Sequence, residues 1–217
     1  GPHARRAGAR AVWSSGPQAA AAAPMGAEFS CSDVDDDTGR RRSAAFQTLY
    51  TAGHRVELAA TPLGPGLPGM QAYHTSVVVD DMEYAFSFDG IYHGPGLMSH
   101  KHLPSGPAKE IYMGLTAISG ERMQEYLKTH FKRASYDLLR KNCNSFSDCA
   151  LYYLLDVRLD TKYRGLEQIG HAADKNAKLV QALSGGDYMP NKEADDFGLE
   201  DVVRKINRNK AAVANFH

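Results

Sequence analysis

The sequence predicts an α+β fold, in which a small antiparallel sheet packs with helices. Two observations support this prediction. Segments that are rich in β-branched and aromatic residues gather between residues 55 and 115, and this composition is typical of strands. Segments in which apolar residues recur at helical spacing gather after residue 119, and they are expected to cover the sheet.

Four segments are predicted to be strands, because turn residues bound them and no breaker interrupts them. They are Arg55–Ala59, Tyr73–Val79, Met82–Phe88 and Glu110–Leu115. Proline and glycine dominate residues 62–69, which predicts a loop after the first strand. Asp80 and Asp81 separate the second and third strands, so these two strands are expected to form a hairpin.

Helices are predicted after the last strand. Ser119 is expected to cap a helix that ends near Phe131, with Met123, Tyr126 and Leu127 on its inner face. The other predicted helices are the one that begins at Cys143, a short one at Tyr163–Ala173, and two more at Ala172–Leu183 and Leu199–Asn209.

The 217 residues are predicted to form three parts. Residues 1–53 are a low-complexity N-terminal arm, residues 54–173 are the folded domain, and residues 174–217 are a C-terminal helical appendage. The arm is too poor in apolar residues to build a core of its own. We therefore expect both flanking parts to serve location or assembly in a larger complex.

Three interpretations of the first 27 residues stay open. An initial Gly-Pro is what a processing protease leaves behind, whereas an Arg- and Ala-rich, acid-poor start is typical of an organelle transit segment. In the third interpretation Met25 is the natural start. Gly26 then begins an N-myristoylation pattern and Cys31 is a palmitoylation site, and two acyl chains together anchor a protein stably.

Composition narrows the functional classes. The formal net charge is +0 and the pI is about 7.3, so a general nucleic-acid or membrane-surface binder is not expected. The sequence contains no run of about 20 apolar residues that could span a bilayer. Three cysteines do not make a disulfide framework. We expect an intracellular protein. Its expected location is the cytoplasm, and an organellar or lipid-anchored location is the alternative.

The residues around Cys143 give the clearest indication of a catalytic site in the sequence. Cys143 stands between Asn142 and Asn144, immediately before an apolar helical segment. Either asparagine can cap the helix, which places the cysteine in or just before its first turn. The unpaired N–H groups and the helix dipole there favour a thiolate. Cys143 is therefore a candidate nucleophile with an expected low pKa.

His74 is the candidate base. It lies near the start of a predicted strand, a rigid position from which to present an imidazole. A thiolate and an imidazole that face each other suffice for acyl transfer. The backbone N–H of Cys143 is the natural oxyanion donor, and Asn142 and Asn144 are both candidates for a second one.

These residues resemble the PPPDE family of cysteine isopeptidases, also called desumoylating isopeptidases. The resemblance extends from about Arg55 to Gly170 and includes a further match at Glu83–Phe86 and at the glycine-containing turn Gly90–His93. The motifs that carry it are Tyr73-His74-Thr75-Ser76, Tyr136-Asp137-Leu138 and Asn142-Cys143-Asn144-Ser145-Phe146. The chain departs from the family at Gln71 and Ala72, where a glycine is common, and in the loop at residues 92–100.

The resemblance implies a permuted papain-like fold, in which the histidine precedes the cysteine. It also implies a His74–Cys143 dyad without a third group, and a ubiquitin-like modifier such as SUMO or ubiquitin, or a protein carrying it, as the substrate. The same dyad could serve a protein thioesterase that removes palmitoyl groups. The alternative from another class is a non-catalytic structural subunit that retains the fold.

Neither a cofactor nor a metal is expected. His93, His100 and His102 lie close together in the sequence, but their spacing fits no standard zinc signature. A solvated loop is the simpler interpretation of these three histidines. Cys149 is expected to pack in the core.

Overall fold

A computed structural model describes residues 53–64, 71–103, 109–165, 186 and 188–214. The N-terminal arm, the predicted helix at 172–183 and most of the one at 163–173 lie outside these residues. None of the described helices is both long and apolar enough to cross a membrane.

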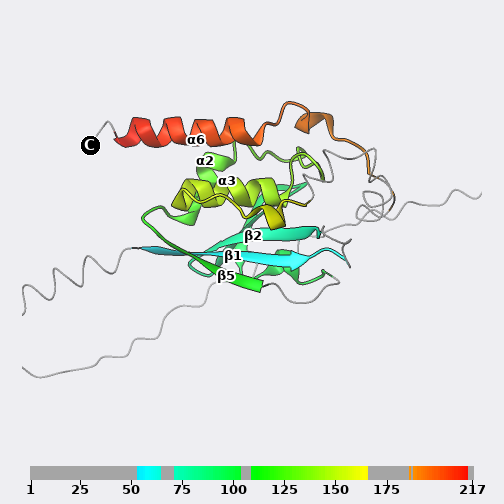
Figure 1. Cartoon of the computed structure of the whole chain (residues 1–217), viewed down its shortest axis with the longest axis horizontal. Coiled ribbons are helices and arrows are strands. Elements are labelled where there is room, and N and C mark those ends of the chain that lie inside the picture. The colour runs from blue at the N-terminus through cyan, green and yellow to red at the C-terminus, as the bar shows by residue number, and fades with distance from the viewer. Residues whose placement is uncertain (1–52, 65–70, 104–108, 166–185, 187, 215–217) are drawn as a thin grey trace, which may run out of the picture. The chain divides into compact units, whose positions relative to one another are not determined.

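The core of the fold is a five-stranded antiparallel sheet with the strand order β4-β3-β2-β1-β5 (Figure 1). The strands are β1 His54–Pro62, β2 Tyr73–Val79, β3 Met82–Ser87, β4 Gly90–Pro95 and β5 Lys109–Thr116. All four predicted strands are present, and the predicted α+β class is confirmed.

The β2–β3 hairpin turns at Asp80 and Asp81, as predicted. Both residues have positive φ values, 48° and 66°, and this pair of left-handed residues matches the twist of a tight hairpin. β4 was not predicted, because residues 90–93 were expected to form a turn and residues 92–100 a loop. The strand pairs with β3 from Ser87↔Gly90 to Met82↔Pro95. At the edge of a sheet, glycine and proline are tolerated because the outer backbone groups need no partner strand.

Three described α-helices complete the domain: α2 Gly120–Leu127, α3 Cys143–Leu155 and α6 Leu199–Ala214. Ser119 caps α2 as predicted, since its side chain accepts a hydrogen bond from the backbone N–H of Arg122. α2 ends earlier than predicted, at Leu127. The chain then turns, and Phe131, which is 1% exposed, packs in the core from outside the helix.

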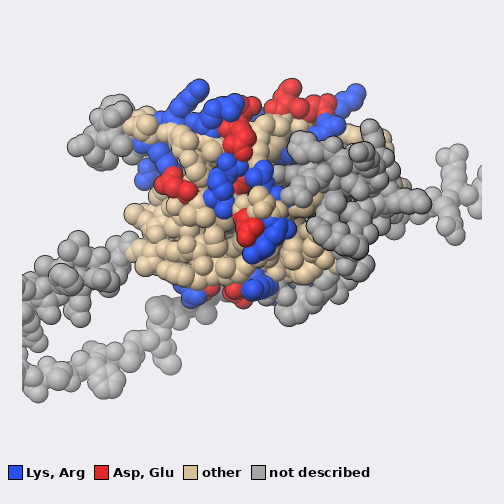
Figure 2. Space-filling view, in the orientation of Figure 1, with Lys and Arg blue, Asp and Glu red and all other residues tan. Residues whose placement is uncertain are grey.

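α3 lies against one face of the sheet, and α6 lies over α3 (Figure 1). The core between these layers is apolar and includes Val56, Leu58, Val77, Val79, Phe86, Phe131, Phe146, Leu151, Val202 and Ile206. In α6 the two acidic residues, Glu200 and Asp201, lie in the first turn, and the charged residues that follow are all basic. Charged side chains of both signs gather at the top of Figure 2.

α6 belongs to the predicted C-terminal appendage, yet it shares the core with α3. Ile206 is fully buried. Asp148 of α3 is also fully buried and accepts hydrogen bonds from Arg158, whose guanidinium in turn pairs with Glu200 of α6. These bonds raise the pKa of Arg158, which therefore stays charged. The helix is thus held to the domain by apolar packing and by a charged bridge.

Candidate active site

Cys143 is the first residue of α3, as predicted, and Asn142 is the cap. The Asn142 side-chain oxygen accepts hydrogen bonds from the backbone N–H groups of Asn144 and Ser145, at 2.9 and 3.1 Å. In turn, the Ser145 hydroxyl accepts a hydrogen bond from the Asn142 backbone N–H at 2.8 Å. This reciprocal capping box fixes the first turn, and with it the position of the Cys143 thiol.

The thiol of Cys143 is enclosed, since the residue is only 2% exposed. The Cys143 thiol donates a hydrogen bond to Asn144 Oδ1 at 3.6 Å. The Thr75 N–H and the Tyr136 hydroxyl lie near enough to the sulfur to favour its charged form and so to lower its pKa. Burial raises the pKa of Tyr136 well above its usual value, so the phenol stays a donor.

The expected low pKa of Cys143 is wrong. Burial raises the pKa of the Cys143 thiol, and the hydrogen bonds from Thr75 and Tyr136 only oppose this shift. Removal of water disfavours the charged form of a thiol more than a helix N-terminus favours it at this site. The resting group is therefore a neutral thiol.

Asn144 carries an unusual group beside this thiol. Its Oδ1 accepts a hydrogen bond from Thr75 Oγ1 at 2.9 Å, and Thr75 Oγ1 also lies 2.9 Å from Ser147 Oγ. Asn144 Nδ2 is buried and has no hydrogen-bond partner among the described residues. A buried N–H group without a partner is unfavourable, and such a group next to a nucleophile suggests a place for a substrate oxygen.

His74 is the second residue of β2 and is partly buried. Its Nε2 lies 2.7 Å from Ser99 Oγ, and its ring centroid lies 4.5 Å from that of His100. Burial, followed by the nearby His100, lowers the pKa of His74 to about 3. The imidazole is therefore neutral near pH 7, as is the thiol of Cys143.

His74 belongs to β2, and the Cys143 sulfur lies next to the residue that follows it, Thr75. Thr75 directs its side chain to α3, and side chains alternate along a strand, so His74 projects to the other face of the sheet. The Thr75 N–H, which directly follows His74 in the chain, contacts the Cys143 sulfur. The hydrogen bonds and ion pairs of the described residues include none between Cys143 and His74, and their pairing stays a prediction.

His100 corrects the expectation of a solvated histidine loop. It is 3% exposed, and its ring nitrogens lie 2.8 Å from Thr61 Oγ1 and 2.9 Å from Ser76 Oγ. Sequence reasoning also missed Ser99 and Glu83 as site residues. The available signal was the single charged residue in the otherwise apolar and aromatic segment Met82–Phe86, and the strand register places this residue, Glu83, on the same face as Ser76.

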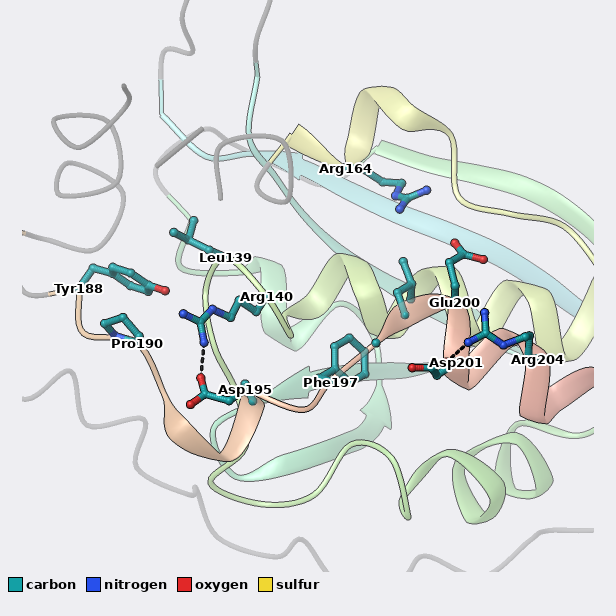
Figure 3. Close-up of a pocket in the computed structure, with 13 residues that line it drawn as sticks. Leu139, Arg140, Arg164, Tyr188, Pro190, Asp195, Phe197, Glu200, Asp201 and Arg204 are labelled. Carbon is teal, nitrogen blue, oxygen red and sulfur yellow. Dashed lines mark hydrogen bonds and ion pairs between the residues drawn. The ribbon is translucent and has the colours of Figure 1, made fainter. Parts of the chain in front are cut away.

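A groove of about 660 Å³ lies elsewhere, between the Leu139–Arg140 loop and residues 188–204 (Figure 3). Neither Cys143 nor His74 lines it, and the described residues of its walls include no serine, cysteine or histidine. Two ion pairs, Arg140–Asp195 and Arg204–Asp201, lie within the walls. The chemistry therefore favours Cys143, and not this groove, as the candidate active site.

Labelling of Cys143 by iodoacetamide is expected to follow its raised pKa. The rate constant should rise about tenfold per pH unit and should still be rising at pH 9, because only the thiolate reacts. The measurement is peptide mapping of the full chain after timed labelling between pH 5 and 10. The urea-unfolded chain is the control, and its rate should level off near the ordinary pKa of cysteine. A plateau between pH 5 and 8 in the folded chain would show a stable thiolate instead.

One model of a known protein family matches the chain. The model of the family described as "PPPDE putative peptidase domain" matches residues 36–183, about two thirds of the chain, and this match includes both His74 and Cys143. No curated protein matches the chain. Among the described residues, no group of three or more histidine, cysteine, aspartate or glutamate side chains could hold a metal ion.

Proposed function

Since the chain belongs to the PPPDE peptidase domain family, we propose that it is a thiol hydrolase that removes ubiquitin-like modifiers from proteins. In this proposal Cys143 is the nucleophile and His74 is the general base. The observation that carries the proposal is the Cys143 thiol itself. It is fixed at the N-terminus of α3, beside a buried amide nitrogen, Asn144 Nδ2, that has no hydrogen-bond partner among the described residues.

The reaction begins from neutral groups. Cys143 Sγ attacks the carbonyl carbon of the isopeptide bond while its proton passes to His74. The two side chains lie on opposite faces of β2, so this transfer requires the His74 ring to reach the sulfur past the edge of the strand, beside the Thr75 N–H. His74 then gives this proton to the leaving lysine amine as the C–N bond breaks, which leaves a thioester on Cys143. Water attacks the thioester, His74 takes a proton from the water, and this proton returns to the sulfur when the modifier leaves.

The tetrahedral intermediates carry a negative oxygen that needs donors. The Cys143 N–H lies in the first turn of α3, where backbone N–H groups have no partner within the helix. Asn144 Nδ2 would supply the second hydrogen bond. We choose it over Asn142, because Asn142 Nδ2 already donates to the Leu138 carbonyl at 2.9 Å. Donors that are already in place stabilise the transition state without reorganisation.

The burial of Cys143 favours a slender substrate. A thiol that is 2% exposed can be reached by a backbone carbonyl only where the flanking residues carry no bulky side chains. Glycine allows such a close approach. A C-terminal Gly-Gly linkage, as in ubiquitin-like modifiers, meets this requirement.

The test uses ubiquitin and SUMO with an electrophilic C-terminus, incubated with the full chain. We expect a covalent adduct that Cys143→Ala abolishes and that Cys149→Ala, the matched change of the other buried cysteine, retains. Labelling by a lipid-thioester probe alone would instead indicate a protein thioesterase. Labelling by neither probe would contradict hydrolase activity and indicate a structural subunit.

A further inference from the structure

Glu83 is the centre of a buried polar network on the sheet face opposite α3. Its side chain is fully buried, and its carboxylate accepts hydrogen bonds from Ser76 Oγ at 2.8 Å and Ser99 Oγ at 2.6 Å. The Ser99 N–H contributes a third bond at 3.1 Å. A buried carboxylate is tolerated only when such bonds satisfy it.

Both serines connect this carboxylate to a histidine. Ser99 Oγ lies 2.7 Å from His74 Nε2, and Ser76 Oγ lies 2.9 Å from His100 Nε2. The network therefore has two similar branches, Glu83–Ser99–His74 and Glu83–Ser76–His100. Only the first of them ends at the candidate base.

The direction of the hydrogen bonds follows from the chemistry of the groups. A carboxylate can only accept, so each serine hydroxyl gives its single proton to Glu83. Ser99 Oγ can then only accept from His74, which requires a proton on His74 Nε2. The other nitrogen of the neutral ring, Nδ1, is left without a proton and is the basic one.

We infer that Ser99 and Glu83 are positioning residues, which hold the His74 ring and fix its proton on Nε2 so that Nδ1 is free to accept the proton of Cys143. This inference rests on the proposed function, in which His74 is the base. When Nδ1 takes the proton, the ring becomes an imidazolium. The negative charge of Glu83, acting through the polarised Ser99 hydroxyl, then stabilises the new positive charge.

The sequence alone identifies no aspartate or asparagine that would orient the His74 ring. In this inference Ser99 and Glu83 have that role. Ser99 comes from the short 3₁₀-helix Met98–His100, and Glu83 from β3. Ser99 and Glu83 thus support the proposed His74–Cys143 dyad from the sheet face opposite α3.

The test compares Ser99→Ala with Ser76→Ala in the full-length, ¹⁵N-labelled protein. Both changes remove one serine hydroxyl bonded to the same carboxylate, but only Ser99 contacts His74. Ser99→Thr keeps the hydroxyl and is the rescue variant. The first readout is the ¹⁵N chemical shifts of the His74 ring, which report the tautomer, with the signals assigned by their loss in His74→Gln. The second is the rate of Cys143 alkylation at pH 7.

We expect His74 to carry its proton on Nε2 in the wild-type protein, in Ser76→Ala and in Ser99→Thr. Ser99→Ala should show a mixture of tautomers and a rate of alkylation higher by about threefold or more, because a proton on Nδ1 would face the sulfur and favour the thiolate, the form that reacts. A proton on Nδ1 in the wild-type protein, or a Ser99→Ala protein with unchanged tautomer or alkylation, would overturn the inference. Neither readout needs a substrate, so the result stands even where modifier probes fail to label Cys143 and the proposed function is rejected.

Discussion

Replacing Asn144 by alanine is expected to lower kcat for isopeptide hydrolysis by about 10²–10³-fold. The reason is the loss of Nδ2, the buried nitrogen without a partner that we assign to the oxyanion. KM should change little, because this hydrogen bond forms chiefly in the transition state. The measurement is steady-state cleavage of a modifier joined to a lysine peptide.

Ser147→Ala is the matched control for this change. Ser147 and Asn144 both contact Thr75 Oγ1 at 2.9 Å, so both variants disturb the same buried contact between α3 and β2. Only Asn144→Ala removes the proposed oxyanion donor. Equal losses of kcat in the two variants would assign Asn144 to packing alone.

Replacing Asp148 by alanine is expected to lower the free energy of unfolding by about 3 kcal/mol. The fully buried carboxylate accepts three close contacts from Arg158 and the Leu159 N–H at 2.7 Å. Its removal leaves a buried N–H group without an acceptor and a guanidinium without its main partner. Urea unfolding, followed by circular dichroism, measures the change.

Glu200→Ala is the control, because Glu200 pairs with the same arginine from the surface. Its side chain is 60% exposed, and an exposed ion pair contributes about 0–1 kcal/mol. A loss for Glu200→Ala as large as that for Asp148→Ala would mean that the attachment of α6, and not the buried carboxylate, carries the stability.

Local patterns in the sequence were sufficient for most of the fold. β2 runs from Tyr73 to Val79, as its β-branched residues predict, and Cys143 begins α3, as the asparagine cap predicts. Both features depend on neighbouring residues alone. β4 could not be predicted in the same way, because Gly94 and Pro95 have low strand propensity. This strand exists because β3 offers it a backbone to pair with.

The candidate site was predicted only in part, because its electrostatics depend on tertiary structure. A cysteine at a helix N-terminus predicts a low pKa, whereas burial raises the pKa of Cys143. His100 is polar and lies between loop residues, yet the network with Thr61 and Ser76 buries it. Ser99 and Glu83 are 16 residues apart, and no local pattern relates them.

The most direct test of the proposed dyad is a crystal structure of the protein trapped at Cys143 by a peptide aldehyde that ends in Gly-Gly. We predict an adduct oxygen about 2.7–3.1 Å from both the Cys143 N–H nitrogen and Asn144 Nδ2. His74 Nδ1 should lie within hydrogen-bond reach of the sulfur or of this oxygen, with Nε2 still bonded to Ser99. A His74 ring that stays on the far face of the sheet, out of reach of the adduct, would contradict the account.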